Sequence, residues 1–358
     1  MSRRLLRMTA LSLAAALVFA ACSNDDDSSS DDGDETIELA QDGSVLAAVQ
    51  ERGEVNCGVN DAGLPGFAVA DGDTYNGFDA DFCKAIAAAI FGDATKVNWV
   101  PLTAEQRFTA LQAGDIDVLI RNTTWTASRD GTEGVTFLHT TFFDGQGMMV
   151  PDSSAFTTIA EMDGATVCVL SGTTTELNLA TKATEEGITL TPLTFESNDE
   201  LQPAYASGQC DGWTSDKSQL TAFASELDGQ RIMEETFSKE PLGPAVADGD
   251  SEWAQIVDWT TLSPIQGEEF GISMGDVEGF TSDDPNVTRW LGQEDPEEGT
   301  VFDPGLGLPT DFNVQVIAAV GNYGEIYDRN LAPIGIPDRG VNGQWTNPPG
   351  LLYAPPYR

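Results

Sequence analysis

The chain alternates short strands with helices along most of its length, and no other feature constrains its fold as strongly. Each strand-like run is followed by a segment in which apolar side chains recur at helical spacing, as Phe82, Ile86 and Ile90 do. Strands are predicted over residues 54–59, 96–101, 117–120, 166–170, 189–195 and 211–214, and helices over 79–90, 102–113, 174–184, 199–207, 216–227, 251–266 and 311–320. This alternation predicts an α/β fold in which helices flank mostly parallel sheets.

The alternation comes in two blocks, which predicts two lobes. A first break is expected near residues 150–152 and a second near 240–243, where two prolines interrupt the pattern. The chain after the second break would return to the first lobe. We therefore expect lobe 1 to comprise residues 43–150 plus 242–358 and lobe 2 residues 151–241, with a hinge of two crossings beside a cleft.

Two local signals bear on helix ends. Thr103 and Gln106 have the spacing of a capping box, in which each side chain accepts the other residue's backbone N–H, and they would open the helix over 102–113. Pro264 falls inside the helix predicted over 251–266. Because proline removes a backbone donor and clashes with the preceding turn, we expect it to end or kink this helix.

The amino terminus has the layout of an export signal. In residues 1–22, three arginines precede an apolar run that ends in small residues and is too short to span a membrane. The ending resembles the bacterial lipoprotein signal, which is cut before a cysteine that is then lipidated, although Phe19 stands where leucine is usual. This predicts a protein in the periplasm or on the outer cell surface, anchored through a lipidated Cys22. Ordinary cleavage, with Cys22 lost or spare, is the alternative.

An acidic tether is predicted over residues 23–42. Its first part, 23–36, contains no apolar residue and seven acidic ones. Such a segment cannot offset the entropy lost on folding, so it should stay solvated beside the anchor.

The charge of the chain excludes several classes of function. The 358 residues include 17 basic and 58 acidic side chains, a formal net charge of −41. So acidic a surface repels phosphate backbones, which excludes nucleic-acid binding through a basic patch. His139 is the single histidine, so multi-histidine metal sites are excluded as well. Residues 71–77 look like a calcium loop with its glycine misplaced and no closing glutamate, and a polar turn is the better interpretation. We predict no metal and no cofactor.

Four cysteines remain when Cys22 is set aside, and an even number in an exported protein favours two disulfides. None is spaced as CxxC, so zinc or thioredoxin-like chemistry has little support. Of the three possible connectivities we prefer Cys57–Cys83 and Cys168–Cys210, because each pair joins a predicted strand to a nearby element in one half of the chain. Four buried thiols are the alternative.

Several runs of sequence are similar to the solute-binding proteins of polar amino-acid ABC transporters, and most closely to the general L-amino-acid type. They include GFDADFCKAIAAAI (77–90), PLTAEQRFTALQAGDIDVLIRNTTWTASRD (101–130), FFDGQGMMVP (142–151), GATVCVLSGTTTELNLA (164–180), SKEPLGPAV (238–246) and the tail ending in YAPPYR. The resemblance covers essentially residues 45–358. It implies a two-lobed type II periplasmic-binding fold that closes on one amino acid and delivers it to a permease in the membrane.

The resemblance also implies a set of ligand contacts. Arg129 follows a strand and a polar loop, at the edge of a parallel sheet where ligands bind, and would hold the α-carboxylate of the ligand. Thr173 and Thr174 open a helix and would close on the same carboxylate from the other lobe, and Asp216 would accept the α-amino group. The alternatives are an ion-paired arginine, a plain helix cap and a capping aspartate.

Four further residues complete the expected site. Asn122 and Thr124 would add backbone or side-chain contacts, and Asn60 stands where many relatives have an aspartate. Arg107 would face the ligand side chain and favour acidic or polar ones, unless it is an exposed charge on an amphipathic helix.

These features favour a binding protein over an enzyme. We expect a monomeric receptor for free L-amino acids, either broad or selective for polar or acidic ones, with an ABC permease as its partner. The alternatives are a ligand-sensing domain and a dehydratase-like enzyme on the same fold. An enzyme would need a catalytic acid or base in the cleft, and His139 lies outside the expected ligand loops.

Overall fold

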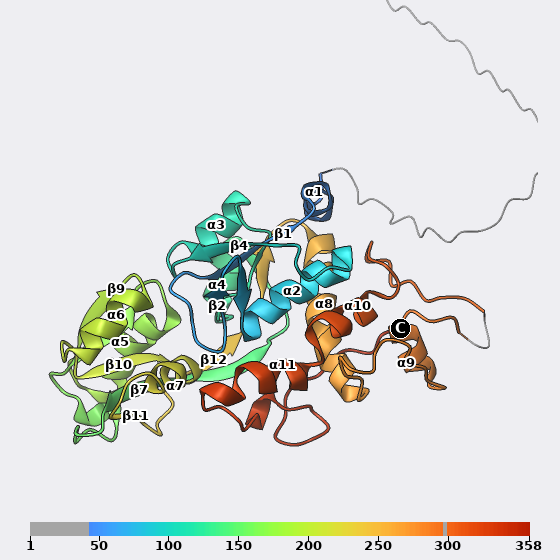
Figure 1. Ribbon diagram of the computed structural model, residues 1–358. Coiled ribbons are helices and arrows are strands. Elements are labelled where there is room, and N and C mark those ends of the chain that lie inside the picture. Colours follow the sequence, from blue (N-terminus) through green and yellow to red (C-terminus); the bar gives the residue numbers. More distant parts are fainter. Residues whose placement is uncertain (1–42, 296–298) are drawn as a thin grey trace, which may run out of the picture. The chain divides into compact units, whose positions relative to one another are not determined.

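The computed structural model describes residues 43–295 and 299–358, and its strands form two main sheets and a separate hairpin (Figure 1). The predicted export signal, its lipidation site Cys22 and the acidic tether lie outside the described residues. Within the described part of the chain, no helix is both long and apolar enough to cross a membrane.

The first sheet combines parallel and antiparallel strands. Its strands are, in spatial order, β4 (Val97–Leu102), β1 (Val55–Asn60), β5 (Val118–Leu119), β13 (Ala245–Ala247) and β6 (Val135–Phe137). β1 is parallel to both β4 and β5, as the alternation of strands and helices predicts. β13 enters after the chain has returned from the second sheet, and it is antiparallel to β5 and β6.

The second sheet repeats this mixture. Its strands are, in spatial order, β11 (Gln230–Ile232), β7 (Phe142–Pro151), β10 (Gly212–Asp216), β8 (Thr166–Leu170) and β9 (Thr191–Phe195), and β12 (Lys239–Leu242) pairs with the other half of β7. β8 is parallel to β10 and β9, whereas β7 is antiparallel to β10, β11 and β12. Both sheets are therefore mixed rather than mostly parallel.

β7 carries the chain from the first sheet to the second. Its first half pairs with β12, and from Gln146 onward it pairs with β10. The first crossing therefore lies inside β7, earlier than the break expected near residues 150–152. β12 lies beside it on the return path, and its last residue Leu242 forms an isolated bridge with Thr124 of the first sheet's loop.

Helices cover both sheets, and the helix α2 (Phe78–Phe91) is buried along most of its length. Its alanine-rich surface lets α8 (Ser251–Glu269) and α10 (Phe312–Val320) pack against it, as Figure 1 shows. The remaining helices are α1 (Val45–Arg52), α3 (Arg107–Ala113), α4 (Ala127–Thr132), α5 (Thr174–Glu186), α6 (Asn198–Ala206), α7 (Lys217–Ala224), α9 (Pro285–Trp290) and α11 (Tyr323–Asn330), with 3₁₀ turns at Ile159–Glu161, Ala332–Ile334 and Gly340–Asn342. β2 (Val69–Asp71) and β3 (Thr74–Asn76) form the hairpin, so the stretch that looks like a calcium loop is a turn.

Two expectations about helix ends are corrected. The helix expected over 102–113 begins only at Arg107, because β4 extends through Leu102 and a turn intervenes. The capping bonds between Thr103 and Gln106 do form, at 3.2 and 3.3 Å. Pro264 does not end its helix, since α8 continues through it to Glu269. The neighbours of Pro264 are buried in the core, and this packing outweighs the local preference.

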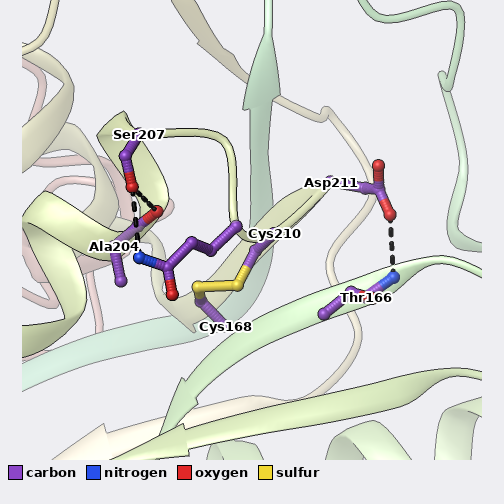
Figure 2. The surroundings of a disulfide bond; sticks show 7 residues. Thr166, Cys168, Ala204, Ser207, Cys210 and Asp211 are labelled. Atoms are coloured by element: carbon purple, nitrogen blue, oxygen red, sulfur yellow. Dashed lines mark hydrogen bonds between the residues drawn. A yellow bond between two sulfur atoms is a disulfide. The ribbon is translucent and has the colours of Figure 1, made fainter.

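Both preferred disulfides are present. Cys57 of β1 is bonded to Cys83 of α2, and Cys168 of β8 is bonded to Cys210, just before β10. Figure 2 shows that the second bond ties the two neighbouring strands together beside a hydrogen bond from the Thr166 N–H to the Asp211 carboxylate, at 2.8 Å. Each disulfide therefore fastens a helix or loop to the parallel strands of one sheet.

Candidate functional site

Side chains from elements that flank both sheets converge on one small cavity. Its walls come from the loop after β5, from α3 and α4, and from the starts of α5 and α7. The lining residues are Arg107, Arg121, Asn122, Thr124, Arg129, Leu170, Thr173, Thr174, Thr175, Ser215, Asp216 and Gln219. Seven of the eight residues expected at a ligand site lie here, and Asn60 does not. Their contacts with a ligand stay predictions.

Arg129 presents a buried cation to this cavity. It belongs to α4 and is 9% exposed. Its guanidinium donates to the backbone oxygen of Thr124 at 2.9 Å and lies 5.4 Å from the centre of the Phe108 ring. Burial lowers the pKa of Arg129 to about 10, and the negative charges of Glu240 and Asp216 partly offset this effect. No carboxylate of the described residues lies within 4.0 Å of it, so its cation is free to pair with a bound anion.

Arg107 is a second buried cation, not an exposed one. It begins α3 and is 2% exposed. It donates to the backbone oxygen of Gly172 at 3.2 Å, whereas its Nε is buried without a partner. A side chain at position 172 would meet Glu105, since an added Cβ would lie 2.8 Å from its Cγ. Burial holds the pKa of Arg107 well below its usual range, and the cations of Arg129 and Arg121 add to this effect. An orphaned donor of this kind indicates a missing acceptor.

Arg121 also lines the cavity, although it was not among the residues predicted from the sequence. It is buried, donates its Nε to the backbone oxygen of Leu102 at 2.8 Å, and lies 3.7 Å from the Asp61 carboxylate. Its position was visible in the sequence, because it directly follows the strand predicted over 117–120 and precedes Asn122.

Asn122 connects the two lobes in an unusual backbone conformation. Its φ of 34° lies in the left-handed region, which asparagine tolerates better than most residues. Its backbone N–H donates to the Asp79 carboxylate at 2.7 Å, and its Nδ2 donates to Asp216 at 3.2 Å and to Gln219 at 3.3 Å. Its Oδ1 is buried without a partner. The residue is thus held on three sides while one acceptor stays unused.

Asp216 supplies a buried carboxylate opposite these cations. It ends β10 and precedes α7, yet its side chain does not cap that helix. The capping alternative is therefore wrong, and the carboxylate is directed to Asn122. Burial and the nearby carboxylates of Asp144 and Glu240 raise the pKa of Asp216 well above its usual range. A cation placed beside Asp216 would relieve this effect.

The start of α5 offers backbone donors. Thr173 caps the helix, because its hydroxyl accepts the Glu176 N–H at 3.1 Å and donates to the backbone oxygen of Leu170 at 2.7 Å. The backbone amides of Thr174 and Thr175 lie in the first turn, where an N–H has no partner within the helix. These donors and the positive end of the helix dipole suit an anion.

Several other side chains lie outside this cavity and make contacts within the protein. Asn60 lies at the end of β1, where its Oδ1 accepts the Ala62 N–H at 3.3 Å and its Nδ2 is buried without a partner. Phe67 belongs to the core, and Trp125 stacks on Phe137 outside the cavity. His139 pairs with Asp258 at 2.7 Å, in a separate apolar hollow.

Further residues around the cavity were not predicted from the sequence. Thr175, Ser215 and Gln219 line it with Leu170, and no motif distinguished them. The carboxylates of Asp79 and Glu240 are buried beside the cavity and accept hydrogen bonds from its lining residues, and that of Asp144 is half-buried. Burial raises the pKa of Asp79 to about 7 and that of Asp144 to about 6.

A second, larger hollow adjoins the cavity. It shares Arg129, Thr173 and Thr174 with the smaller cavity. Glu105, Glu133 and Glu176 lie along its other walls. The space beyond Arg129 is therefore open and acidic.

Comparison with known proteins gives consistent matches. Residues 55–288 match the bacterial extracellular solute-binding proteins, family 3. The general L-amino acid-binding periplasmic protein AapJ of Rhizobium johnstonii is 47% identical over 328 residues, which cover 89% of this chain and 94% of the relative. The glutamate/glutamine/aspartate/asparagine-binding protein BztA of Rhodobacter capsulatus is 43% identical over 328 residues, covering 89% and 95%.

A solved structure shares the whole architecture. The ABC transporter periplasmic binding protein from Brucella ovis, determined with glutathione bound, aligns with a TM-score of 0.83 and 43% identity. The alignment covers 88% of this chain and 99% of the other. This likeness confirms the two-lobed periplasmic-binding fold.

Proposed function

The chain belongs to family 3 of the bacterial extracellular solute-binding proteins, and on this premise we propose that it captures free L-amino acids in the cavity and delivers them to an ABC permease. One observation carries the choice of ligand. A single small cavity holds a buried guanidinium without an ion pair, Arg129, and a buried carboxylate that caps no helix, Asp216. These are complementary to the two charges that every free amino acid carries.

The α-carboxylate of the ligand would bind Arg129. A guanidinium can make two parallel hydrogen bonds to a carboxylate, and the backbone amides of Thr174 and Thr175 can donate from the other lobe. Thr173 would contribute indirectly, since its hydroxyl already serves as the helix cap. The carboxylate would then join α4 of one lobe to α5 of the other.

The α-ammonium group would bind Asp216. Asn122 now holds this carboxylate from across the cavity, and its own Oδ1 can accept a further hydrogen bond from the ligand. Thr124 lines the same wall. Because the ligand contacts both lobes, it would stabilise the closed arrangement. The gain equals the difference between its binding free energies to the closed and the open arrangement.

The ligand side chain would face Arg107. The unpartnered Nε of this buried arginine suits a carboxylate, amide or hydroxyl, which predicts a preference for acidic or polar side chains. Asn60 lies outside the lining, so we assign it support of the β1 end rather than direct contact.

A short peptide is the second candidate ligand. The solved relative from Brucella ovis has glutathione bound, and here the larger open hollow continues from the cavity past Arg129. A single amino acid would leave this hollow empty, whereas a γ-glutamyl peptide would extend into it.

The setting follows from the family and the amino terminus. The family is extracellular, and we propose that the exported chain is monomeric, lacks enzymatic activity and stays at the membrane through a lipidated Cys22. Its lobes would divide along β7 and β12, near the expected limits of 43–150 plus 242–358 and 151–241.

A ligand screen tests the function. The melting temperature of the purified exported chain would be measured with each of the twenty L-amino acids, with D-enantiomers, sugars and simple dicarboxylates as controls, and with glutathione. At one hundred times Kd a ligand adds about 2.7 kcal/mol of stability, which is readily detected. Shifts with L-amino acids and not with the controls are expected. A shift with glutathione alone would favour the peptide, and no shift with either class would refute the assignment.

A further inference from the structure

Glu240 is a buried carboxylate at the second crossing, behind the cavity wall. It lies in β12 opposite Asp144 of β7 and is 1% exposed. Among the described residues, no lysine, arginine or histidine nitrogen lies within 4.0 Å of it. A buried carboxylate without a cation is unfavourable unless hydrogen bonds hold it, so its partners show what it is for.

Three donors converge on Glu240. The Thr174 hydroxyl donates to Oε2 at 2.8 Å, the Asn178 Nδ2 donates to Oε1 at 3.0 Å, and the Ser238 hydroxyl also donates to Oε1. Thr174 is the one of these three that lines the cavity. Glu240 therefore touches the site through the hydroxyl of Thr174.

This contact determines which hydroxyl donates and which accepts in two consecutive hydrogen bonds. An ionised carboxylate can only accept, so the single proton of the Thr174 hydroxyl points at Glu240. The Thr124 hydroxyl lies 3.3 Å from the Thr174 hydroxyl on the other lobe. Thr174 has no second proton to give, so in this contact Thr124 must be the donor. Both protons are then used in these two hydrogen bonds, so neither hydroxyl has a proton left to donate to a ligand and each can only accept.

We infer that Glu240 is a positioning residue that makes the Thr174 and Thr124 hydroxyls acceptors, and that it thereby selects ligands with an ammonium group at the α-carbon. This rests on the proposed function of the cavity. A 2-oxo acid has the same carboxylate and side chain as its amino acid but places an acceptor at the α-carbon. Against two fixed acceptor oxygens, that group finds no donor.

The substitution Glu240→Gln should reverse the direction of the hydrogen bond between residue 240 and the Thr174 hydroxyl. Asn178 and Ser238 both donate at the Oε1 position, so the glutamine oxygen is best placed there and the amide NH₂ at the Oε2 position. The NH₂ would then donate to Thr174, whose proton becomes free to turn toward the cavity. A hydroxyl that can donate should accept a 2-oxo group and bind an ammonium group less well.

Two ligand pairs measure the effect, L-glutamate with 2-oxoglutarate and L-alanine with pyruvate. Calorimetry on the purified exported chain gives Kd for each ligand, and circular dichroism checks folding. The preference of the wild type for the amino acid over its 2-oxo acid should fall by a factor of about 10 to 100 in E240Q, the range for one hydrogen bond to a charged group.

Two control variants separate the effect of hydrogen-bond direction at Thr174 from the effect of removing a negative charge near the cavity. Asp144→Asn removes a half-buried carboxylate that acts on Asp216 more strongly than Glu240 does, and its hydrogen bonds go to other groups than the two threonines. Loss of this negative charge disfavours an ammonium group relative to an anionic 2-oxo acid, so D144N should narrow the preference by this electrostatic part only, and by less than E240Q does. Ser238→Ala removes another donor to Glu240 and should leave the preference unchanged.

Thr174→Val tests the inference even if E240Q does not fold. Loss of an acceptor should weaken the binding of the amino acids and leave the binding of the 2-oxo acids nearly unchanged. Adding E240Q to this variant should cause no further change in the preference. Equal weakening of both members of a pair would mean that the Thr174 hydroxyl donates to the ligand carboxylate, and the inference would be wrong. The same holds if E240Q keeps the wild-type preference or if D144N narrows it equally. If the wild type binds neither amino acid nor any other in the screen, the proposed function fails and the inference falls with it.

Discussion

Replacing Arg129 by methionine should abolish high-affinity binding of amino acids while leaving the fold intact. Methionine has a similar length and can still pack against the Phe108 ring, so the change removes mainly the cation, its donors and its cation–π contact with that ring. The Arg129 guanidinium makes one hydrogen bond to the protein, to the backbone oxygen of Thr124, and no ion pair among the described residues. Little of the native structure therefore depends on its charge.

The size of the loss follows from burial. The ligand carboxylate would be enclosed in the cavity beside Asp216, with backbone amides as its remaining donors. Truncating one member of a buried charge pair costs about 2 to 5 kcal/mol, because the other charge stays desolvated and unpaired. This corresponds to a rise in Kd of roughly 30-fold to several thousand-fold.

Calorimetry with the best ligand of the screen measures this change, and denaturant unfolding without ligand shows whether the fold survives. Arg52→Met is the matched control. It removes a guanidinium of the same lobe that pairs with Asp117 outside the cavity, so Kd should stay within twofold of the wild type. If R129M binds as tightly as R52M, Arg129 does not hold the carboxylate and the ligand lies elsewhere.

Three further predictions concern selectivity, pH and the disulfides. Arg107→Met should reduce any preference for L-glutamate over L-glutamine by about tenfold, because the cation that separates a carboxylate from an amide is lost; an unchanged ratio in calorimetry would assign the side chain to another residue. Burial raises the pKa of Asp79 to about 7, against about 4 in the unfolded chain, so between these values the folded state binds more protons and the free energy of unfolding falls as pH rises. Asp79→Asn lacks this contribution and should gain stability relative to the wild type between pH 5 and pH 8 in urea titrations, whereas a constant difference would contradict the raised pKa. Replacing Cys168 and Cys210 by serine should lower the free energy of unfolding by about 4 kcal/mol, the loop-entropy value for a separation of 42 residues, and the amino-acid Kd measured below the new melting temperature should stay close to the wild type.

The parallel parts of the fold could be predicted because their signals are local. The helix predicted over 79–90 is α2, which is one residue longer at each end. The strand predicted over 166–170 is β8, with the same ends. The antiparallel strands were not predicted. β7 contains Gly145 and Gly147, which weaken a strand pattern, and its pairing is with strands that come much later in the chain. Pro264 is a case in which a local signal misleads, since the packing of α8 outweighs the preference of proline to end a helix.

The candidate site divides in a similar way. Arg129, Asp216 and Thr173 follow strands or open helices, so their positions at the sheet edge could be inferred from the order of elements. Glu240 could not, because its importance depends on the approach of α5 to β12 across the sequence. Whether Arg107 is buried also depends on the other lobe, whose Gly172 accepts its hydrogen bond.

The balance of charge around the cavity explains why a ligand should matter so much to this protein. Three of its 17 basic residues, Arg107, Arg121 and Arg129, line one small space in a chain of net charge −41. Each is desolvated, and burial lowers the pKa of each, so the cluster is unfavourable unless anions neutralise it. Asp61 serves Arg121, but Arg107 and Arg129 have no carboxylate within 4.0 Å among the described residues. We therefore expect a bound anion to supply the close partner that Arg107 and Arg129 lack, so that the cations that destabilise the empty cavity would be paired when it is filled.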